Sequence, residues 1–192
     1  MEILLLGLLL FLGVHSLHIV APDTRKSFVA KMGAGVWKGV FSLVSIAGFV
    51  LICFGYAAAR REMSMLWIPP TGMRHAAGLL MLVAMVLLVA TYVPRNSIKV
   101  RLHHPMLLAT KVWAFAHLLA NGMVADLLLF GSFLVWAIVA FAVARRRDRA
   151  AGTVYAAGTS RATLVTGLLG VALWVVLAFG LHAMLFGVSP FG

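Results

Sequence analysis

Long apolar runs alternate with short polar or basic segments from one end of the chain to the other. A helix needs about 20 apolar residues to cross the ~30 Å hydrocarbon core of a bilayer, and the runs have roughly that length. The pattern therefore predicts an all-α integral membrane protein, a bundle of six helices in a single domain over residues 1–192. The predicted spans cover about 3–20, 40–59, 75–92, 106–120, 123–144 and 164–186.

Residues 103–133 form the most informative stretch, because they are apolar enough for a membrane yet include His117, Asn121 and Asp126. Polar groups at membrane depth are costly, so they mark either a functional site or an internal polar contact. A lipid-facing helix would carry no such side chains. We therefore expect this stretch to lie inside the bundle and to contribute to any site.

Two local signals divide this stretch into two antiparallel helices. His104-Pro105 predicts a helix start, because proline is tolerated in the first turn and pushes the preceding residue away from helical geometry. Asn121-Gly122 predicts a turn. One helix is therefore expected on each side of Asn121-Gly122, with His117 near the junction.

The composition excludes a soluble globular protein. Hydrophobic residues make up 63% of the chain and charged residues 11%, and the mean hydropathy is +1.05. The single cysteine, Cys53, lies in an apolar run, so it predicts neither an intrachain disulfide nor a cysteine metal motif. The apolar N-terminus, with Glu2 as its nearest charge, predicts a retained first span rather than a cleaved signal peptide.

The basic residues favour six spans and predict an orientation. The net charge of +11 arises between the apolar runs, so membrane orientation explains it better than nucleic-acid binding. Six spans place 13 of the 16 basic residues on one side, whereas a single span over 106–144 would divide them eight and eight. The positive-inside rule then predicts cytoplasmic basic loops, and both termini on the periplasmic side of a bacterial inner membrane.

Composition also gives expectations for single elements. The small residues Ser42, Ser45 and Gly48 predict that the second span approaches another helix closely. Residues 75–92 are almost purely aliphatic, which predicts a lipid-facing helix. The segment that leads to Thr159 is rich in glycine, threonine, serine and alanine, which predicts a flexible linker.

Of the seven histidines, His15 and His117 are the deepest in predicted spans. One intramembrane histidine is as readily a hydrogen-bond partner between helices as a ligand. Two on different helices favour a ligand role, because facing histidines hold haem or metal in bundle cores. The scarcity of carboxylates and thiols then favours a bis-histidine haem site over a zinc or di-iron cage. The two Cα atoms are expected to differ by roughly 7 Å in depth, and His104 is the alternative match for His15.

Other residues near these histidines are further candidates for the site. Asp126 and Asn121 suit either a hydrogen bond to a ligand histidine or a structural role at the helix junction, and the structural role is favoured. Arg25, with its neighbour Lys26, suits haem propionates as well as membrane orientation. Trp113, four residues before His117, suits either bundle packing or the wall of a flat cofactor.

Four pieces of the sequence together resemble one known family. They are His15-Ser16 followed by Arg25, the run FSLVSIAGF, His104-Pro105 with WAFAHLLANG, and the terminal LFGVSP. In this order and spacing, over nearly the whole length, they are similar to the NnrU family, which includes the zeta-carotene isomerases. The resemblance implies an integral membrane protein and, for bacterial members, a link to denitrification and nitric-oxide metabolism.

For the isomerase branch, the resemblance implies haem b held by two histidines, which match His15 and His117. In that branch a cysteine three residues before the second histidine can replace it as iron ligand, but Ala114 stands there in this chain. Ligand exchange by that route is therefore absent, which counts against carotenoid isomerisation.

Three functions remain open from the sequence. The first is a b-type haem protein of the inner membrane that serves redox or nitric-oxide-linked chemistry, with a redox partner. The second is an isomerase of a lipophilic polyene, and the third is a non-catalytic membrane partner in which the histidines only join helices. Whether the chain is an enzyme depends on which of these holds. The lipid bilayer is a partner in all three, and nucleic acid is a partner in none.

Overall fold

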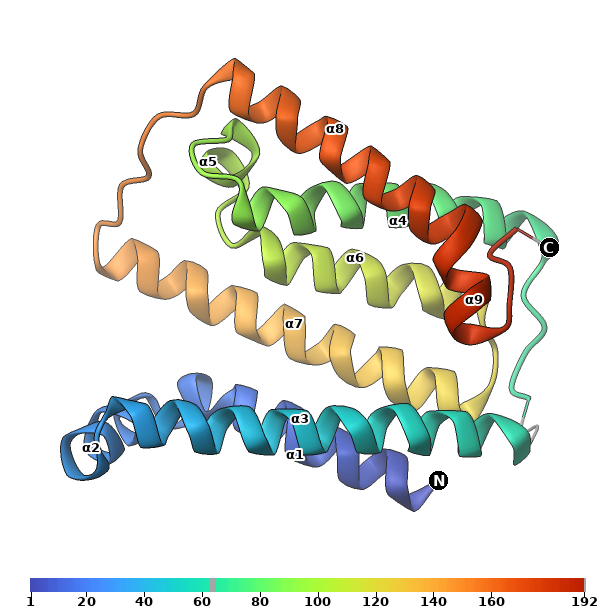
Figure 1. Cartoon of the computed structure of the whole chain (residues 1–192), viewed down its shortest axis with the longest axis horizontal. Helices are drawn as coiled ribbons and strands as arrows, with labels where there is room; N and C mark the ends of the chain where they lie inside the picture. Colours follow the sequence, from blue (N-terminus) through green and yellow to red (C-terminus); the bar gives the residue numbers. More distant parts are fainter. Residues whose placement is uncertain (63–64, 192) are drawn as a thin grey trace. The chain divides into compact units, whose positions relative to one another are not determined.

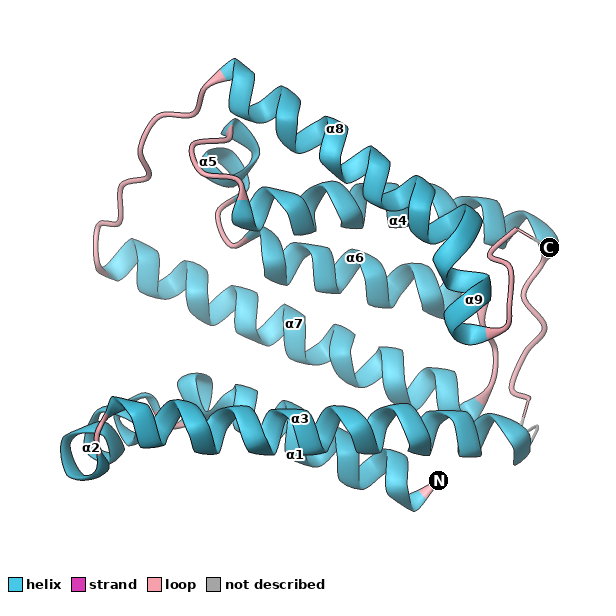
Figure 2. Cartoon of the chain, in the orientation of Figure 1, coloured by secondary structure: helices cyan, strands magenta, loops and turns pink. Residues whose placement is uncertain are grey.

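The computed structural model describes residues 1–62 and 65–191, which form helices joined by loops (Figures 1 and 2). The helices are α1 (Glu2–Val20), α2 (Pro22–Met32), α3 (Ala34–Ala59), η1 (Arg60–Glu62), α4 (Thr71–Tyr92), α5 (Ser97–Leu102), α6 (Pro105–Ala120), α7 (Val124–Ala150), α8 (Ser160–Val176), the π-helical turn η2 (Leu177–Leu181) and α9 (His182–Phe186). The predicted all-α class is confirmed.

Within the described residues, five helical segments are long and apolar enough to cross a membrane. They are α1, α3 with η1, α4, α7, and α8 continued through η2 and α9. The sixth predicted span, α6, has 16 residues and is a shorter apolar helix. The multi-pass membrane class is therefore supported, with five long candidate spans rather than six.

The predicted break within residues 103–133 is present. His104 is the N-cap of α6, and Pro105 occupies its first turn. The helix ends at Ala120, and α7 begins only at Val124. Because the extended Asn121 separates them, residues 106–144 form two helices and not one long span.

Contacts within the chain divide it into two compact units. The first unit contains residues 1–67 and 123–136, and the second contains residues 68–122 and 137–192. Each unit is described by itself below. The helix α7 contributes its first half to the first unit and its second half to the second.

In the first unit, α1 and α3 pack against each other along their length (Figure 1). They are antiparallel, because Gly55 lies against the backbone of Leu4, whereas Gly48 lies against that of Phe11. A Cβ atom at Gly48 would be 2.8 Å from the amide nitrogen of Phe11, a distance that real side chains do not adopt. The close approach predicted at Gly48 is confirmed, but Ser42 is exposed and takes no part in it.

In the second unit, α4 packs against both α6 and α8, so it is the central helix of this unit. Its buried residues include Ala77, Gly78, Ala84 and Ala90. The prediction of a lipid-facing helix at 75–92 was therefore wrong. Since lipid chains and neighbouring helices are both apolar, hydropathy does not distinguish them, and the small residues that permit close helix packing were the better signal.

The segment between α7 and α8 is fastened to the second unit at its far end. The amide nitrogen of Thr159 donates to the carbonyl oxygen of Arg95 at 2.8 Å, and the hydroxyl group of Thr159 caps α8. Gly158 lies so close to Ser97 that a Cβ atom would be 2.7 Å from the Ser97 Cα. The segment expected to be a flexible linker therefore makes specific contacts where it enters α8.

We predict that Gly48→Ala lowers the free energy of unfolding by about 1–3 kcal/mol, because the added methyl group meets backbone that cannot move aside. Thermal or denaturant unfolding in detergent measures the change. Gly39→Ala is the matched control on the same helix, because a Cβ atom there meets nothing within 4 Å. It should be neutral, or stabilise the helix by up to about 1 kcal/mol. Equal effects of the two substitutions would contradict the proposed close packing.

Candidate functional site

His15 is held in one tautomer by its own helix. Its Nδ1 atom is 2.7 Å from the carbonyl oxygen of Phe11, one turn earlier on α1. A carbonyl oxygen only accepts hydrogen bonds, so Nδ1 carries the proton and donates it. The lone pair of the imidazole then lies on Nε2. This is the arrangement in which histidine ligates a metal through Nε2.

Aromatic rings surround His15 within the first unit. Its ring stacks on Phe11 with a centroid distance of 4.3 Å, and Phe41 and Trp136 meet it edge-on at 5.0 and 6.3 Å. Phe11 also contacts the ring of Phe133, at 5.7 Å. These rings come from α1, α3 and the first half of α7, so His15 lies in an apolar environment made by three helices.

The indole nitrogen of Trp136 is exceptional in this aromatic environment. It is buried, and it has no hydrogen-bond partner among the residues that the structure describes. An unpaired buried N–H group costs roughly 1–3 kcal/mol, so such groups are rare in folded proteins. A donor is therefore left over beside His15.

His117 has the same local geometry on α6 in the second unit. Its Nδ1 atom is 2.9 Å from the carbonyl oxygen of Trp113, again one turn earlier, so the lone pair again lies on Nε2. The rings of Trp113 and His117 are 5.4 Å apart and inclined at 51°, which confirms the contact expected from their spacing. Asn121 donates from Nδ2 to the backbone oxygen of His117 at 2.9 Å and so stabilises the end of α6.

The residues beside these two histidines limit the chemistry. Ala114, three residues before His117, is fully buried, and Cys53 is an exposed free cysteine on α3. Within residues 1–62 and 65–191, no group of three or more histidine, cysteine or acidic side chains is placed to hold a metal ion.

Asp126 is completely buried at the start of α7 and joins it to the end of α3. Its Oδ1 atom accepts hydrogen bonds from the Tyr56 hydroxyl at 2.6 Å and from Arg60 Nη1 at 3.2 Å. Arg60 also donates to the Tyr56 oxygen at 3.0 Å, and the Met123 amide donates to Asp126 Oδ2 at 2.9 Å. The structural role favoured for Asp126 is confirmed.

His104, the alternative ligand from the sequence, lies beside an acidic residue of its own unit. Its Nε2 atom is 2.9 Å from Oδ2 of Asp148, and His103 Nδ1 is 3.6 Å from the same oxygen. The Tyr155 hydroxyl donates to that oxygen at 3.0 Å, and burial together with this bond raises the pKa of Tyr155. His103 has φ 59°, a strained value worth about 1–3 kcal/mol, where the chain turns from α5 into α6. His104 therefore has a carboxylate neighbour in its own unit, and its role toward a cofactor stays a prediction.

Arg25 and Lys26, the candidate propionate ligands, lie on α2. Both side chains are exposed, and Lys26 pairs with Asp23 at 3.0 Å. Exposed pairs of this kind contribute little stability. Both residues therefore suit the orientation of the membrane protein, and a role toward a cofactor stays a prediction.

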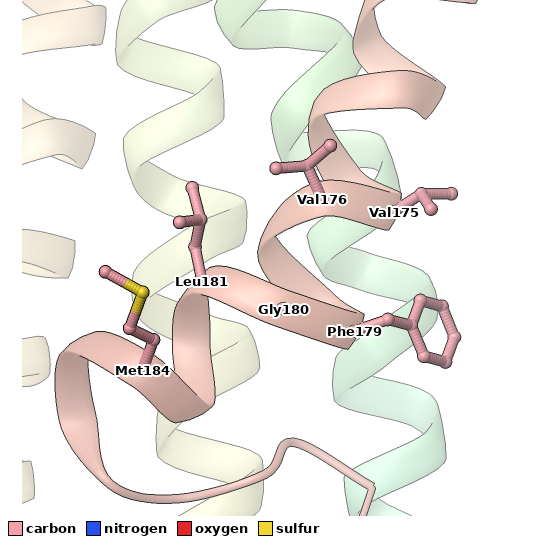
Figure 3. A pocket seen from close by; sticks show the side chains of 6 residues that line it. All are labelled: Val175, Val176, Phe179, Gly180, Leu181 and Met184. Atoms are coloured by element: carbon pink, nitrogen blue, oxygen red, sulfur yellow. The ribbon is translucent and has the colours of Figure 1, made fainter.

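An open apolar hollow of about 490 Å³ lies where α8 continues into η2 and α9 in the second unit (Figure 3). It is lined by Val175, Val176, Phe179, Gly180, Leu181 and Met184. No lining side chain is polar, so nothing there would orient a reacting group. Lipid chains suit such a surface on a candidate membrane span.

Sequence reasoning missed three residues that the structure brings into these arrangements. Tyr56 and Arg60 are one turn apart at the end of α3, and this spacing was an available signal for a polar pair. Trp136 gave no local signal, because it lies in an apolar run ten residues beyond Asp126 and only the packing brings it to His15.

We predict that Asp126→Asn lowers the free energy of unfolding by about 1–3 kcal/mol, because it removes the charge that pairs with Arg60 and one of its acceptor positions. The effect stays modest because the Arg60 side chain is 36% exposed and partly screened by solvent. Chemical unfolding in detergent measures it. The matched control, Asp23→Asn, removes an exposed ion pair and should change stability by less than about 0.5 kcal/mol. An unchanged Asp126→Asn variant would contradict this account.

Comparison with known proteins supports the resemblance drawn from the sequence. The family model described as NnrU protein matches residues 3–190. The search of curated proteins and the search of solved structures gave no significant match. The matched region includes both α1 with His15 and α6 with His117. Because the family model covers nearly the whole chain, the protein belongs to the NnrU family.

Proposed function

We propose that this NnrU-family membrane protein binds haem b through His15 and His117 and serves redox or nitric-oxide-linked chemistry in the bacterial inner membrane. The observation that carries the proposal is the fixed tautomer of His15. Its Nδ1–H group is engaged by the Phe11 carbonyl, and its lone pair lies on Nε2 in an apolar, aromatic environment. A histidine prepared in this way is a suitable axial ligand for haem iron.

The residues present fit such a cofactor on two further grounds. The indole N–H of Trp136 is a buried donor without a partner in the described part of the chain, beside His15. His117 has the same engaged Nδ1 atom and a tryptophan ring alongside. A flat aromatic cofactor suits environments of aromatic rings, because their faces stack on it.

Haem held in this way would supply one-electron transfer, and nitric oxide would bind at its iron only where one of the two imidazoles is displaced. The chain's own contribution is to hold two neutral imidazoles in a fixed tautomer and to exclude water. A hydrogen bond from Nδ1–H to a carbonyl makes the ligand nitrogen more basic, which stabilises the oxidised iron.

The competing explanation is that the histidines serve only to join helices. The Nδ1 bonds to Phe11 and Trp113 are formed within single helices, so these bonds themselves join nothing. The bond to Phe11 uses only Nδ1 of His15, so the Nε2 lone pair points away from that bond. A ligand role for His15 would use Nε2 directly.

We predict that the detergent-purified protein, supplied with haem, shows sharp reduced bands of a low-spin b-type haem. His15→Ala and His117→Ala should each abolish the low-spin spectrum, because each removes one axial ligand. The visible spectrum before and after reduction with dithionite measures this. His182→Ala is the matched control, because its Nδ1 atom is also held by a backbone carbonyl, that of Val188 at 2.7 Å, but its side chain is not assigned to the cofactor. Stoichiometric low-spin haem in the doubly substituted His15→Ala, His117→Ala protein would refute the proposal.

We also propose that α6 crosses the membrane with the five longer helices, which gives six spans and periplasmic termini. At about 1.5 Å per residue, its 16 residues extend ~24 Å, a little less than the hydrocarbon core. Local thinning of the bilayer accommodates that difference at modest cost. The charge distribution supports this arrangement, since it places 13 of 16 basic residues on the cytoplasmic side.

The orientation predicts that alkaline phosphatase fused after Pro190 is active, because this reporter folds only in the periplasm. A fusion in the basic segment after α7, at Gly152, should be inactive. Measuring phosphatase activity in intact cells checks both. The reverse pattern, or equal activities at the two positions, would contradict six spans with periplasmic termini.

A further inference from the structure

We infer that Trp136 donates a hydrogen bond from its indole nitrogen to an oxygen atom of the group held at His15. This inference rests on the proposed function, which it deepens by naming a binding residue that neither the sequence nor the family match assigns. It places that residue on the first half of α7, in the same unit as His15.

Trp136 carries a buried donor without a partner. Its Nε1 atom has no hydrogen-bond partner among the described residues, and the same holds for two other buried nitrogen atoms, His103 Nδ1 and His104 Nε2. Those two lie 3.6 and 2.9 Å from Oδ2 of Asp148, so a carboxylate is close to both. In the unit of His15, by contrast, the hydroxyl groups of Ser16 and Ser45 donate to backbone oxygens one turn earlier at 2.6 and 2.7 Å.

The Trp136 ring lies close to the imidazole ring of His15. The Trp136 ring meets the His15 ring edge-on, with a centroid distance of 6.3 Å and an interplanar angle of 87°. The other rings that contact His15, Phe11 and Phe41, have no polar atom. Trp136 is therefore the one side chain among these aromatic contacts that can bind a polar part of a ligand.

The hydrogen-bonding chemistry of indole limits what Trp136 can bind. An indole nitrogen only donates hydrogen bonds, so the partner must be an acceptor. Haem b has oxygen acceptors only in its two propionate carboxylates, and a diatomic ligand on the iron would add one more oxygen. Both are oxygen acceptors. The experiment below distinguishes the two sources.

The chain offers a matched tryptophan. Trp174 Nε1 donates to the carbonyl oxygen of Gly78 at 2.9 Å, so its N–H group is already paired in the protein without a cofactor. Replacing tryptophan by phenylalanine removes the N–H group and keeps an aromatic ring. Trp174→Phe therefore removes a donor that the protein itself uses, whereas Trp136→Phe removes the donor that we assign to the bound group.

The experiment compares Trp136→Phe and Trp174→Phe in the full-length protein, without and with haem. Without haem, Trp136→Phe should lower the melting temperature less than Trp174→Phe does, because both lose the same ring volume but Trp136→Phe also removes an unpaired buried donor. Trp174→Phe should lower the melting temperature, because it removes a hydrogen bond. With haem, Trp136→Phe should release haem about 2- to 10-fold faster than the wild type, the range expected for the loss of one hydrogen bond. Trp174→Phe should leave the release rate unchanged.

Spectroscopy gives a readout that a merely structural role would not change. In protein labelled with ¹⁵N on its indoles, the Trp136 N–H resonance should shift downfield when reduced low-spin haem is added, and the Trp174 resonance should not. Two arms identify the acceptor. A Trp136→Phe effect that disappears with haem dimethyl ester identifies a propionate, and an effect that appears only after carbon monoxide is added identifies a ligand on the iron.

Two results would overturn the inference alone. One is wild-type protein that binds haem while Trp136→Phe releases it at the same rate in every arm. The other is a loss of melting temperature in the haem-free Trp136→Phe protein as large as that of Trp174→Phe. Both substitutions remove the same ring volume, so an equal loss would mean that the Trp136 N–H group already has a partner. A wild-type protein that takes up no haem at all would instead overturn the proposed function and this inference with it.

Discussion

The close contact between α1 and α3 at Gly48 is the constraint on which the first unit depends. Since Gly48 has no side chain, the backbone of Phe11 can lie directly against α3. Phe11 then performs two further tasks, because its carbonyl oxygen accepts the Nδ1 proton of His15 and its ring stacks on the imidazole. The glycine therefore acts on the tautomer and surroundings of His15 without touching it. A packing contact and the candidate ligand are parts of one arrangement.

Several polar side chains of the apolar helices form hydrogen bonds within their own helix. The hydroxyl groups of Ser16, Thr110 and Thr166 each donate to a carbonyl oxygen one turn earlier, and His15 and His117 do so through Nδ1. Such bonds satisfy a polar group inside its own helix, as a membrane requires where no water is present. Asp126 cannot be satisfied in this way and instead gathers donors from α3 and from its own helix start. Trp136 Nε1 differs from these groups, because it is buried and has no hydrogen-bond partner among the described residues.

Much of the fold was predictable from the sequence, but the packing partners were not. The apolar runs predicted the long helices, and His104-Pro105 with Asn121-Gly122 predicted where α6 begins and ends. The small size of Gly48 predicted one close contact correctly. The aliphatic helix α4 was assigned to lipid although it is central in its unit, because hydropathy measures transfer from water and is nearly blind to whether lipid or another helix replaces the water. Trp136 was missed for a related reason, since its significance comes only from the residues it meets.

Residue 114 matters both for the packing of α6 and for the ligand exchange known from the isomerase branch. Ala114 is fully buried, so its methyl group is part of the packing of α6 and not an open position. In the isomerase branch that the sequence resembles, ligand exchange depends on a cysteine at this place, and Cys53, exposed on α3, is no substitute. In the proposed haem site, His117 would therefore keep its place as a ligand, since no cysteine three residues away would compete for the iron. A cofactor with two permanent imidazole ligands is suited to electron transfer, and it binds nitric oxide only when one imidazole is displaced. Two permanent imidazole ligands would favour the redox alternative over isomerisation. The hydrogen bond from His15 to the Phe11 carbonyl would then help to decide how easily nitric oxide displaces that imidazole.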